Sequence, residues 1–107
     1  MIRLAAALVL SASLGAFAAG EPEFTLVIEN HKFTPERLEV PAGQKVKLKI
    51  DNRDASAEEF ESHDLKVEKV IPGRKSGFVF VGPLKAGEYK FVGEFHEKTA
   101  QGVLVAK

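Results

Sequence analysis

The stretch Glu88-Tyr-Lys-Phe-Val-Gly-Glu-Phe-His-Glu-Lys-Thr-Ala-Gln-Gly-Val-Leu-Val-Ala106 decides how this chain folds. Residues 89–93 alternate aromatic with other side chains, so the aromatics share one face of an extended strand. Residues 103–105 form a second apolar run, and the segment between the two runs carries His96. We therefore expect a hairpin of two β-strands whose connecting loop presents an imidazole.

Short alternating runs separated by turn signals continue through the rest of the chain, and this pattern is typical of a β-sandwich. Residues 45–51 give the clearest run, because apolar side chains alternate with lysines and leave one dry and one wet face. A polar loop is expected at residues 52–59. The runs predict about seven strands, at residues 24–29, 38–40, 45–51, 61–67, 78–81, 89–93 and 103–105.

The first residues have the composition of a secretory signal. Arg3 supplies a basic start, residues 4–14 are apolar, and Ala16-Phe17-Ala18 is a small-x-small cleavage site. The apolar stretch is too short to span a bilayer. We therefore predict a signal peptide at 1–18 and one exported domain at 19–107 that does not itself insert into the membrane.

Sulfur is absent from the predicted mature chain, because the sequence has no cysteine and its one methionine is Met1. Small exported domains often depend on disulfides, and here stability must come from packed apolar strands instead. The same composition removes the thiolate and thioether ligands that hold Cu(I) best.

Charge is balanced over the chain, with 15 basic and 15 acidic residues and a formal net charge of +0. This balance gives no bulk attraction to nucleic acid or to anionic lipid. The sequence also contains no Ser-His-Asp or Cys-His arrangement and no glycine-rich phosphate loop, so hydrolytic catalysis has no support.

The hairpin resembles the final hairpin of the cupredoxin family. In that family a strand ending Tyr-x-Phe-x-Cys is followed three residues later by a ligand histidine, then by an axial residue and a closing strand. Tyr89, Phe91 and His96 match this arrangement, and Gln101 falls about where the axial ligand lies. Gly93 stands at the position of the cysteine. The resemblance therefore implies a metal site that has lost its thiolate.

Three further segments fit the cupredoxin frame. Residues 33–43 resemble the opening F-x-P-x-x-hydrophobic-x-V-x-x-G, and residues 46–52 resemble the strand whose final Asn precedes the loop with the first ligand histidine. Residues 71–73 resemble the turn after the strand of that ligand. The resemblance covers nearly the whole mature chain and implies an all-β, cupredoxin-like Greek-key β-sandwich.

Two segments, residues 52–65 and 93–102, resemble a narrower group: the small periplasmic cupredoxin-like proteins that accompany bacterial Ftr-type iron permeases. This resemblance implies a periplasmic location and the handling of copper or iron. It also implies a role: the protein oxidises Fe(II), or delivers iron to an Ftr-type permease or its periplasmic accessory. Whether the chain is an enzyme is left open.

The metal ligands are predicted from the two loops of the cupredoxin site. His96 is the first candidate, because neutral imidazole is the commonest transition-metal ligand. Counting back from residues 71–72 places the other ligand near Ser62 or His63. If residues 61–67 form one strand, Glu61 and His63 face the core together with Leu65, whereas Ser62 does not face it. Glu61, His63 or both remain candidates.

His31 and Glu94 complete the predicted set. His31 follows the first strand, in a segment that borders the metal end of cupredoxins, and Glu94 adds a carboxylate near His96. The alternative interpretation is that each of these candidates is an ordinary solvated side chain with no metal contact. Imidazole and carboxylate ligands suit Cu(II), Fe, Mn or Zn better than Cu(I). An acidic rim would concentrate cations at the same end, formed by residues Glu58, Glu59, Glu94, Asp64 and Glu97.

Two other functions compete with metal-assisted iron uptake. One is a metal-free interaction module that keeps the cupredoxin sandwich as a scaffold, since a fold does not fix a function. The other is an electron carrier with a non-blue copper, because a blue copper centre needs a thiolate.

Overall fold

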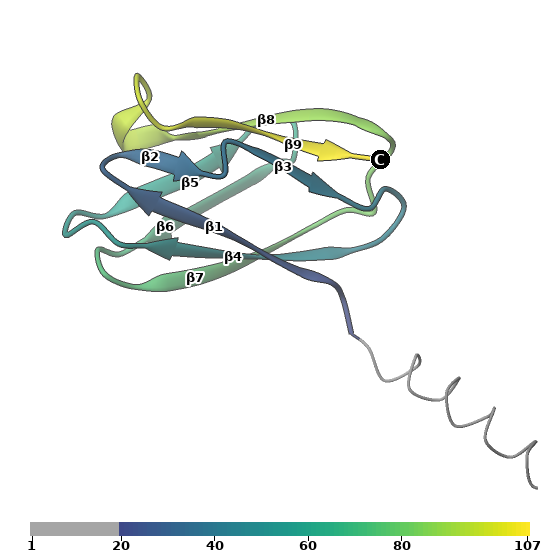
Figure 1. The fold of residues 1–107 in the computed structure, drawn as a ribbon, viewed down its shortest axis with the longest axis horizontal. Helices are drawn as coiled ribbons and strands as arrows, with labels where there is room; N and C mark the ends of the chain where they lie inside the picture. Colours follow the sequence, from purple (N-terminus) through teal and green to yellow (C-terminus); the bar gives the residue numbers. More distant parts are fainter. Residues whose placement is uncertain (1–19) are drawn as a thin grey trace, which may run out of the picture.

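The computed structural model describes residues 20–107, so the signal peptide predicted at 1–18 lies outside the described residues. Strands and one short 3-10 helix make up this part of the chain (Figure 1). The elements are β1 (Glu23–Glu29), β2 (Lys32–Thr34), β3 (Arg37–Val40), β4 (Val46–Asn52), β5 (Glu58–Ser62), β6 (Val67–Ile71), β7 (Ser76–Val81), β8 (Gly87–Gly93), η1 (Glu94–His96) and β9 (Gln101–Ala106).

The strands form two mixed sheets that pack face to face (Figure 1). One sheet has the order β2-β1-β4-β7 and the other the order β3-β9-β8-β5-β6. β1 runs parallel to β4 and β3 parallel to β9, whereas the other pairs are antiparallel. The predicted all-β sandwich is confirmed, with nine strands between residues 20 and 107. No helix in this range is long and apolar enough to cross a membrane.

The core lies between the sheets and is built by alternate side chains of each strand. On β4, Val46, Leu48 and Ile50 are fully buried, whereas Lys47 and Lys49 point to the outer face. The alternation read from the sequence is therefore confirmed for this strand. Each such aliphatic side chain contributes about 1.5–3 kcal/mol on burial, so β4 anchors its sheet to the core.

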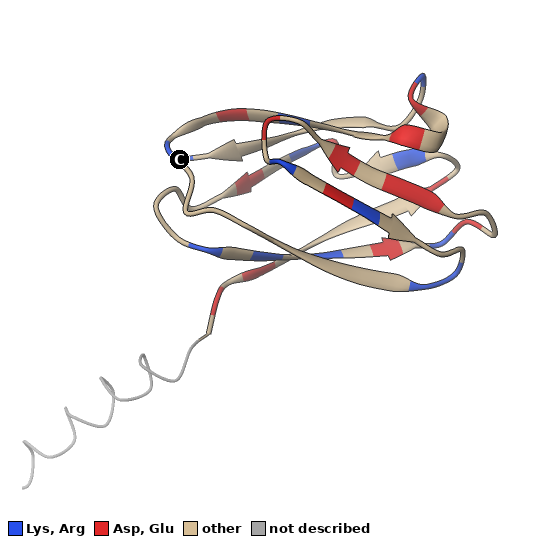
Figure 2. Cartoon of the chain, turned by 180° about the vertical axis from the view of Figure 1, so that it is seen from behind, with Lys and Arg blue, Asp and Glu red and all other residues tan. Residues whose placement is uncertain are grey.

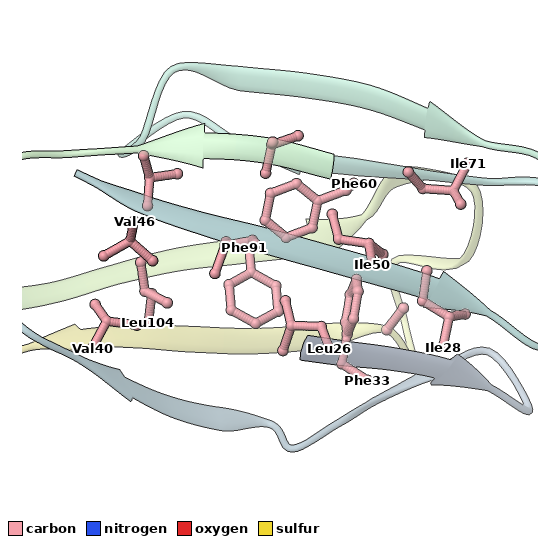
Figure 3. Close-up of a cluster of buried hydrophobic side chains, with 14 of the residues drawn as sticks. Leu26, Ile28, Phe33, Val40, Val46, Ile50, Phe60, Ile71, Phe91 and Leu104 are labelled. Atoms are coloured by element: carbon pink, nitrogen blue, oxygen red, sulfur yellow. The ribbon is translucent and has the colours of Figure 1, made fainter. Parts of the chain in front are cut away.

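Three phenylalanines fill the middle of the core, between Val40 and Val46 on one side and Ile28 and Ile71 on the other (Figure 3). Phe33 comes from β2, and Phe60 and Phe91 come from the opposite sheet. The ring of Phe33 meets that of Phe91 edge to face, with centroids 4.9 Å apart, and that of Phe60 at 6.1 Å. Such pairs add about 0.5–1.5 kcal/mol each beyond the area that they bury. Phe33 thus fixes the three-residue strand β2, which the sequence pattern did not predict.

The prediction of a polar loop over residues 52–59, followed by one strand over 61–67, was wrong. β5 already begins at Glu58, and a turn at residues 63–66 separates it from β6. Lys66 in this turn has a φ of 58°. Alternation does not carry through a turn, so the inward residue is Ser62, which is 3% exposed. Glu61 therefore faces outward from β5, and His63 is exposed in the turn.

Ser62 is buried because its hydroxyl has two partners. The Oγ atom donates to the carbonyl of Lys90 at 2.6 Å and accepts the N–H of Leu65 at 3.0 Å. A buried hydroxyl without partners would cost about 1–3 kcal/mol. The two hydrogen bonds thus fix the end of β5 and direct Glu61 to the outer face.

Four segments meet at one end of the sandwich: the β1–β2 turn, the end of β4, the start of β5, and η1 (Figure 1). The C-terminus lies at the opposite end, where the Lys107 N–H donates to the carbonyl of Val40 at 3.1 Å. This topology brings loops that are distant in sequence to the same tip, which is where the candidate site lies.

Candidate metal centre

Glu58 carries the only buried carboxylate among residues 20–107, with 1% of the residue exposed. Its Oε2 atom lies 2.7 Å from Nδ1 of His96. Its Oε1 atom accepts the backbone N–H groups of Glu59, at 3.0 Å, and Phe95, at 2.9 Å. A buried carboxylate is costly unless it is paired and hydrogen-bonded. These contacts offset that cost and connect the start of β5 to η1.

Gly93 provides the space for the Glu58 carboxylate. A Cβ atom at position 93 would lie 2.6 Å from Cδ of Glu58, 2.7 Å from its Oε2, and 2.7 Å from Cβ of Ala100. Non-bonded carbon atoms pack best at about 3.5–4.0 Å. The carboxylate therefore fills the space beside the β8 position that is a cysteine in the family that the sequence resembles.

His31 reaches the same place from the other sheet. It lies in the turn between β1 and β2, where Asn30 and His31 have φ angles of 56° and 58°. The left-handed region is uncommon for residues other than glycine. Asp54, in the β4–β5 loop, accepts the N–H of Asn30 through Oδ1 at 2.8 Å and that of His31 through Oδ2 at 3.0 Å. Asp54 thus holds the turn that carries His31.

The pKa of the Asp54 carboxyl is lowered from its ordinary value of 3.8. Burial acts in the opposite direction, but the hydrogen bonds from the backbone N–H groups of His31 and Asn30 favour the charged form. The nearby His31 and His96 side chains favour it further. A negative charge therefore sits beside the two imidazoles.

The imidazole rings of His31 and His96 stack, with centroids 3.6 Å apart and planes at 12°. The His96 side chain is 26% exposed, so solvent reaches the pair. Glu58 contacts His96 from the core side, and Asp54 contacts the backbone of His31. Two carboxylates and two imidazoles thus gather at the tip, although they come from three separate segments.

Asn52 organises the loop that supplies both carboxylates. Its Nδ2 atom donates to the carbonyls of Ser56 at 2.9 Å and Ile71 at 3.1 Å, and its Oδ1 accepts the N–H of Asp54 at 3.0 Å. The residue is 1% exposed. Asn52 therefore fixes Asp54, and through Asp54 it fixes the turn that carries His31. This is the physical role of the Asn that ends the cupredoxin-like segment 46–52.

Glu61 and Glu94, two of the predicted ligands, come together away from the imidazole pair. With Glu68 they form a group of carboxyls on the outer side of β5 and β6. A side-chain hydrogen bond with Glu94, burial and a hydrogen bond with Glu68 raise the pKa of Glu61 to about 7. The structure thus separates these two acids from Glu58, which contacts His96.

His63 lies away from the imidazole pair, and the Gln101 amide is engaged by the backbone. Ser62 is four residues along β5 from Glu58, or roughly 13 Å at the usual strand rise, and His63 follows it. The Gln101 amide Nε2 donates to the carbonyl of Glu97 at 2.8 Å. Of the predicted histidines, only His31 and His96 are brought together.

Glu58 is the residue at this tip that the sequence did not single out as a candidate ligand, since it was included only in an acidic rim. A signal for it was present. Phe60 is an evident core residue, and strand alternation places positions 58 and 62 on the same face as Phe60. The expected loop over residues 52–59 concealed this alternation, because it removed Glu58 from the strand.

Comparison with known proteins identifies the family to which the chain belongs. The profile of the family described as cupredoxin-like domain matches residues 1–106. The chain belongs to the cupredoxin-like domain family. This cupredoxin-like protein is 45% identical over 83 residues to the uncharacterized protein RP394 of Rickettsia prowazekii (strain Madrid E). The match covers 78% of the chain and 66% of the length of RP394.

Solved structures of other proteins share the cupredoxin fold at low identity. Auracyanin A, described as a blue copper protein from Chloroflexus aurantiacus, has a TM-score of 0.70 at 18% identity, covering 82% of this chain and 100% of auracyanin A. The metal binding domain of the Cu(I) exporting P-type ATPase CopA of Streptococcus pneumoniae has a TM-score of 0.67 at 13% identity, covering 79% and 84%. These likenesses establish the fold.

A blue copper centre does not fit the residues of this cupredoxin-like protein. The sequence has no cysteine, and the space beside Gly93 is filled by the Glu58 carboxylate. Within residues 20–107, no three His, Asp or Glu side chains are arranged to hold a metal ion as they stand. The stacked rings explain this for the histidines, since two nearly parallel rings with centroids 3.6 Å apart cannot both direct a ring nitrogen at one ion.

A carboxylate–imidazole pair does fit a cation that prefers oxygen and nitrogen. Oε2 of Glu58 and Nδ1 of His96 are 2.7 Å apart. Metal–nitrogen and metal–oxygen bonds of about 2.0–2.2 Å allow two donors at this spacing to occupy adjacent positions on one ion. His31 would become a third ligand once its ring leaves the stack. The donor chemistry therefore suits Cu(II), Fe or Zn.

Proposed function

We propose that this chain is an exported, periplasmic metal-binding protein of the cupredoxin-like family that holds copper or iron through Glu58 and His96, with His31 as a third ligand. The contact between the buried Glu58 carboxylate and Nδ1 of His96 carries the proposal. A divalent cation would replace the proton shared by these two atoms. Several structural neighbours are described as copper proteins, which makes Cu(II) the first metal to test.

Each residue has a separate part in this site. Glu58 supplies an anionic oxygen held in place by two backbone N–H groups. His96 supplies a neutral nitrogen, and Asp54 keeps the His31 turn beside it. A bound copper or iron ion would supply a one-electron redox centre at the tip of the sandwich. Oxygen ligands stabilise the oxidised, harder ion, which favours Fe(III) over Fe(II).

The proposed role in iron uptake extends the resemblance to proteins that accompany Ftr-type permeases. In this role the protein would deliver Fe(II), or oxidise it by one electron passed to an external acceptor such as dioxygen, for such a permease or its periplasmic accessory. The test is growth on limiting iron of a strain that lacks the chain. We expect the wild-type gene to restore growth and Glu58→Gln or His96→Ala to fail. Restoration by both variants would contradict the role.

Metal binding itself is tested by calorimetric titration of the purified protein with Cu(II), Fe(II) and Zn(II). Glu58→Gln and His96→Ala should each weaken Cu(II) binding by at least about tenfold, because each removes one ligand. His31→Ala should have a smaller effect. His63→Ala is the matched control, since His63 is an exposed imidazole in the turn after β5, and it should bind as the wild type does.

A metal-free interaction module is the second candidate function. The stacking of His31 on His96, and the engagement of His96 Nδ1 by Glu58, favour it because both imidazoles already have partners. In this case the contacts of Glu58 with His96 and of His96 with His31 serve only to stabilise the tip of the sandwich. No saturable binding of any of the three metals at micromolar concentration would support this function and overturn the first.

A further inference from the structure

The outer face of the β4–β7 pair carries lysines and phenylalanines that the core does not use. Val79 and Val81 take the inward positions of β7, whereas Phe78 and Phe80 are 43% and 47% exposed. Nζ of Lys47 lies 4.2 Å from the ring centroid of Phe78. We define Lys45, Lys47, Lys49, Phe78 and Phe80 as the basic–aromatic face.

Cation–π contacts cover this face only in part. Nζ of Lys45 lies 4.8 Å from the ring centroid of Phe80, and such exposed contacts contribute about 0.5–1 kcal/mol each. With these contacts in place, Phe78 and Phe80 still have nearly half of their residue surface exposed. Large aromatic side chains exposed together on the outer face of a sheet commonly mark an interaction site.

The outer side of the other sheet carries the opposite charge. Glu59 and Glu61 on β5 lie beside Val70 and Glu68 on β6, and Val70 is 49% exposed. Glu94 joins them from η1. In Figure 2, acidic residues gather along β5 and η1, β6 carries both an acidic and a basic residue, and basic residues recur along β4. We define Glu59, Glu61, Glu68, Glu94 and Val70 as the acidic face.

The charges of the acidic face are not neutralised within the described part of the chain. Among residues 20–107, none of its four glutamates forms an ion pair. Glu94 and Glu68 both contact the Glu61 carboxyl, so these like groups crowd one another on the acidic face. Lysines brought against this face would relieve the repulsion. On the basic–aromatic face, only Lys47 forms an ion pair, a long one of 3.9 Å with Glu23.

We propose that the basic–aromatic face of one copy of this chain docks onto the acidic face of a second copy. Each face supplies the charge that the other lacks, and each has an exposed apolar centre, Phe78 with Phe80 on one and Val70 on the other. Pairing of two basic–aromatic faces would instead bring lysines against lysines, which is costly. The contact is therefore head to tail.

An anionic membrane is a poorer occupant of the basic–aromatic face. Lipid-binding surfaces of this kind carry clusters of about four to eight basic residues. Here three lysines share the face with the carboxylates of Glu23 and Asp51, which lie on the outer side of β1 and β4. A protein surface with matched charges fits this mixed pattern better.

The two faces lie on opposite sides of the sandwich, so a copy that uses one face keeps the other free. A head-to-tail contact that does not close into a ring adds further copies in series. Its electrostatic part is screened as salt rises. The proposal therefore implies reversible assembly that grows with protein concentration and is lost at high salt, with or without metal.

Sedimentation velocity of the purified protein, at concentrations from micromolar to millimolar, tests the proposal. At low salt we expect the mean mass to rise with concentration. Phe78→Ser with Phe80→Ser should weaken self-association by at least about tenfold, as for other aromatic contacts at interface centres. Lys85→Glu with Lys98→Glu changes charge at exposed positions outside both faces and should have no effect.

Charge reversal provides the decisive experiment. Variant X carries Lys47→Glu and Lys49→Glu, and variant Y carries Glu59→Lys and Glu68→Lys. Each alone should remain monomeric, because its two faces repel. An equimolar mixture should associate again, since the unchanged faces of X and Y are complementary. Circular dichroism tests whether both variants are folded. If variant X is not folded, a variant with Lys47→Gln and Lys49→Gln replaces it.

Three outcomes of the self-association experiments would overturn the proposal. The wild type stays monomeric at low salt over the whole range; the phenylalanine variant assembles as the wild type does; or the mixture of X and Y fails to associate. Co-sedimentation with phosphatidylglycerol vesicles, without self-association, would assign the basic–aromatic face to lipid instead and would also overturn it.

Discussion

The packing of Gly93 against Glu58 gives the sharpest prediction. In Gly93→Ala, the new methyl group would lie 2.6–2.7 Å from Cδ and Oε2 of Glu58 and from Cβ of Ala100. Neither neighbour yields easily, because three contacts hold the Glu58 carboxylate and the Ala100 Cβ is bonded directly to the backbone. Overpacking of this kind costs about 1–3 kcal/mol.

The expected loss of about 2 kcal/mol corresponds to a fall in Tm of about 8–16 °C, taking 4–8 °C per kcal/mol for a domain of this size. Urea and thermal unfolding followed by circular dichroism measure both quantities. Gly20→Ala is the matched control, because a Cβ there meets nothing within 4 Å. It should change the free energy of unfolding by less than about 0.5 kcal/mol.

A double-mutant cycle with Glu58→Ala assigns the effect to this contact. Removing the carboxylate should cost less in the Gly93→Ala background than in the wild type, with a coupling energy of about 1 kcal/mol or more. The Ala100 contact remains in the double variant, so relief should be partial. If Gly93→Ala is as stable as Gly20→Ala, or if the coupling is absent, the carboxylate does not fill this space and the reasoning fails.

Three further predictions concern the polar groups around the tip. Asn52→Ala should destabilise the protein by about 2–3 kcal/mol in urea unfolding, because it leaves buried backbone groups without partners; a loss under about 0.5 kcal/mol would contradict the role of Asn52. Asp54 has a lowered pKa, so it stabilises the fold at neutral pH and this contribution is lost as pH falls below 3.8. Asp54→Asn should therefore flatten the acid limb of the stability curve and broaden the NMR signals of the His31 turn. Glu61 has a raised pKa, so the native state favours its protonated form and stability falls as pH rises from 4.5 through about 7. Glu61→Gln should remove this fall in stability between urea melts at pH 5 and 8. If the variant loses as much stability between these pH values as the wild type, Glu61 does not share the contacts with Glu94 and Glu68 described above.

Prediction from the sequence succeeded where the deciding pattern is local. The alternation along β4 depends only on the period of a strand, and the buried Val46, Leu48 and Ile50 confirm it. The same reasoning failed at residues 61–67, because the turn at residues 63–66 interrupts the alternation. Ser62 then faces inward and Glu61 outward.

The amino-acid composition is sufficient to decide one chemical question. A chain without cysteine cannot build a thiolate-ligated copper centre, and because its single methionine is Met1 it has no thioether ligand between residues 20 and 107. No arrangement of the strands changes this conclusion, since it depends on which atoms are present and not on where they lie.

Tertiary structure alone decided which acid accompanies His96. Glu58, Glu61 and Glu94 are equivalent as letters in a sequence, yet only Glu58 is buried beside the imidazole. That choice depends on the space left by Gly93 and on the register of β5 against β8, in which Phe60 lies opposite Gly93. The stacking of His31 on His96 likewise depends on hydrogen bonds that the His31 turn donates to Asp54, in a loop more than twenty residues away, which no short-range periodicity encodes.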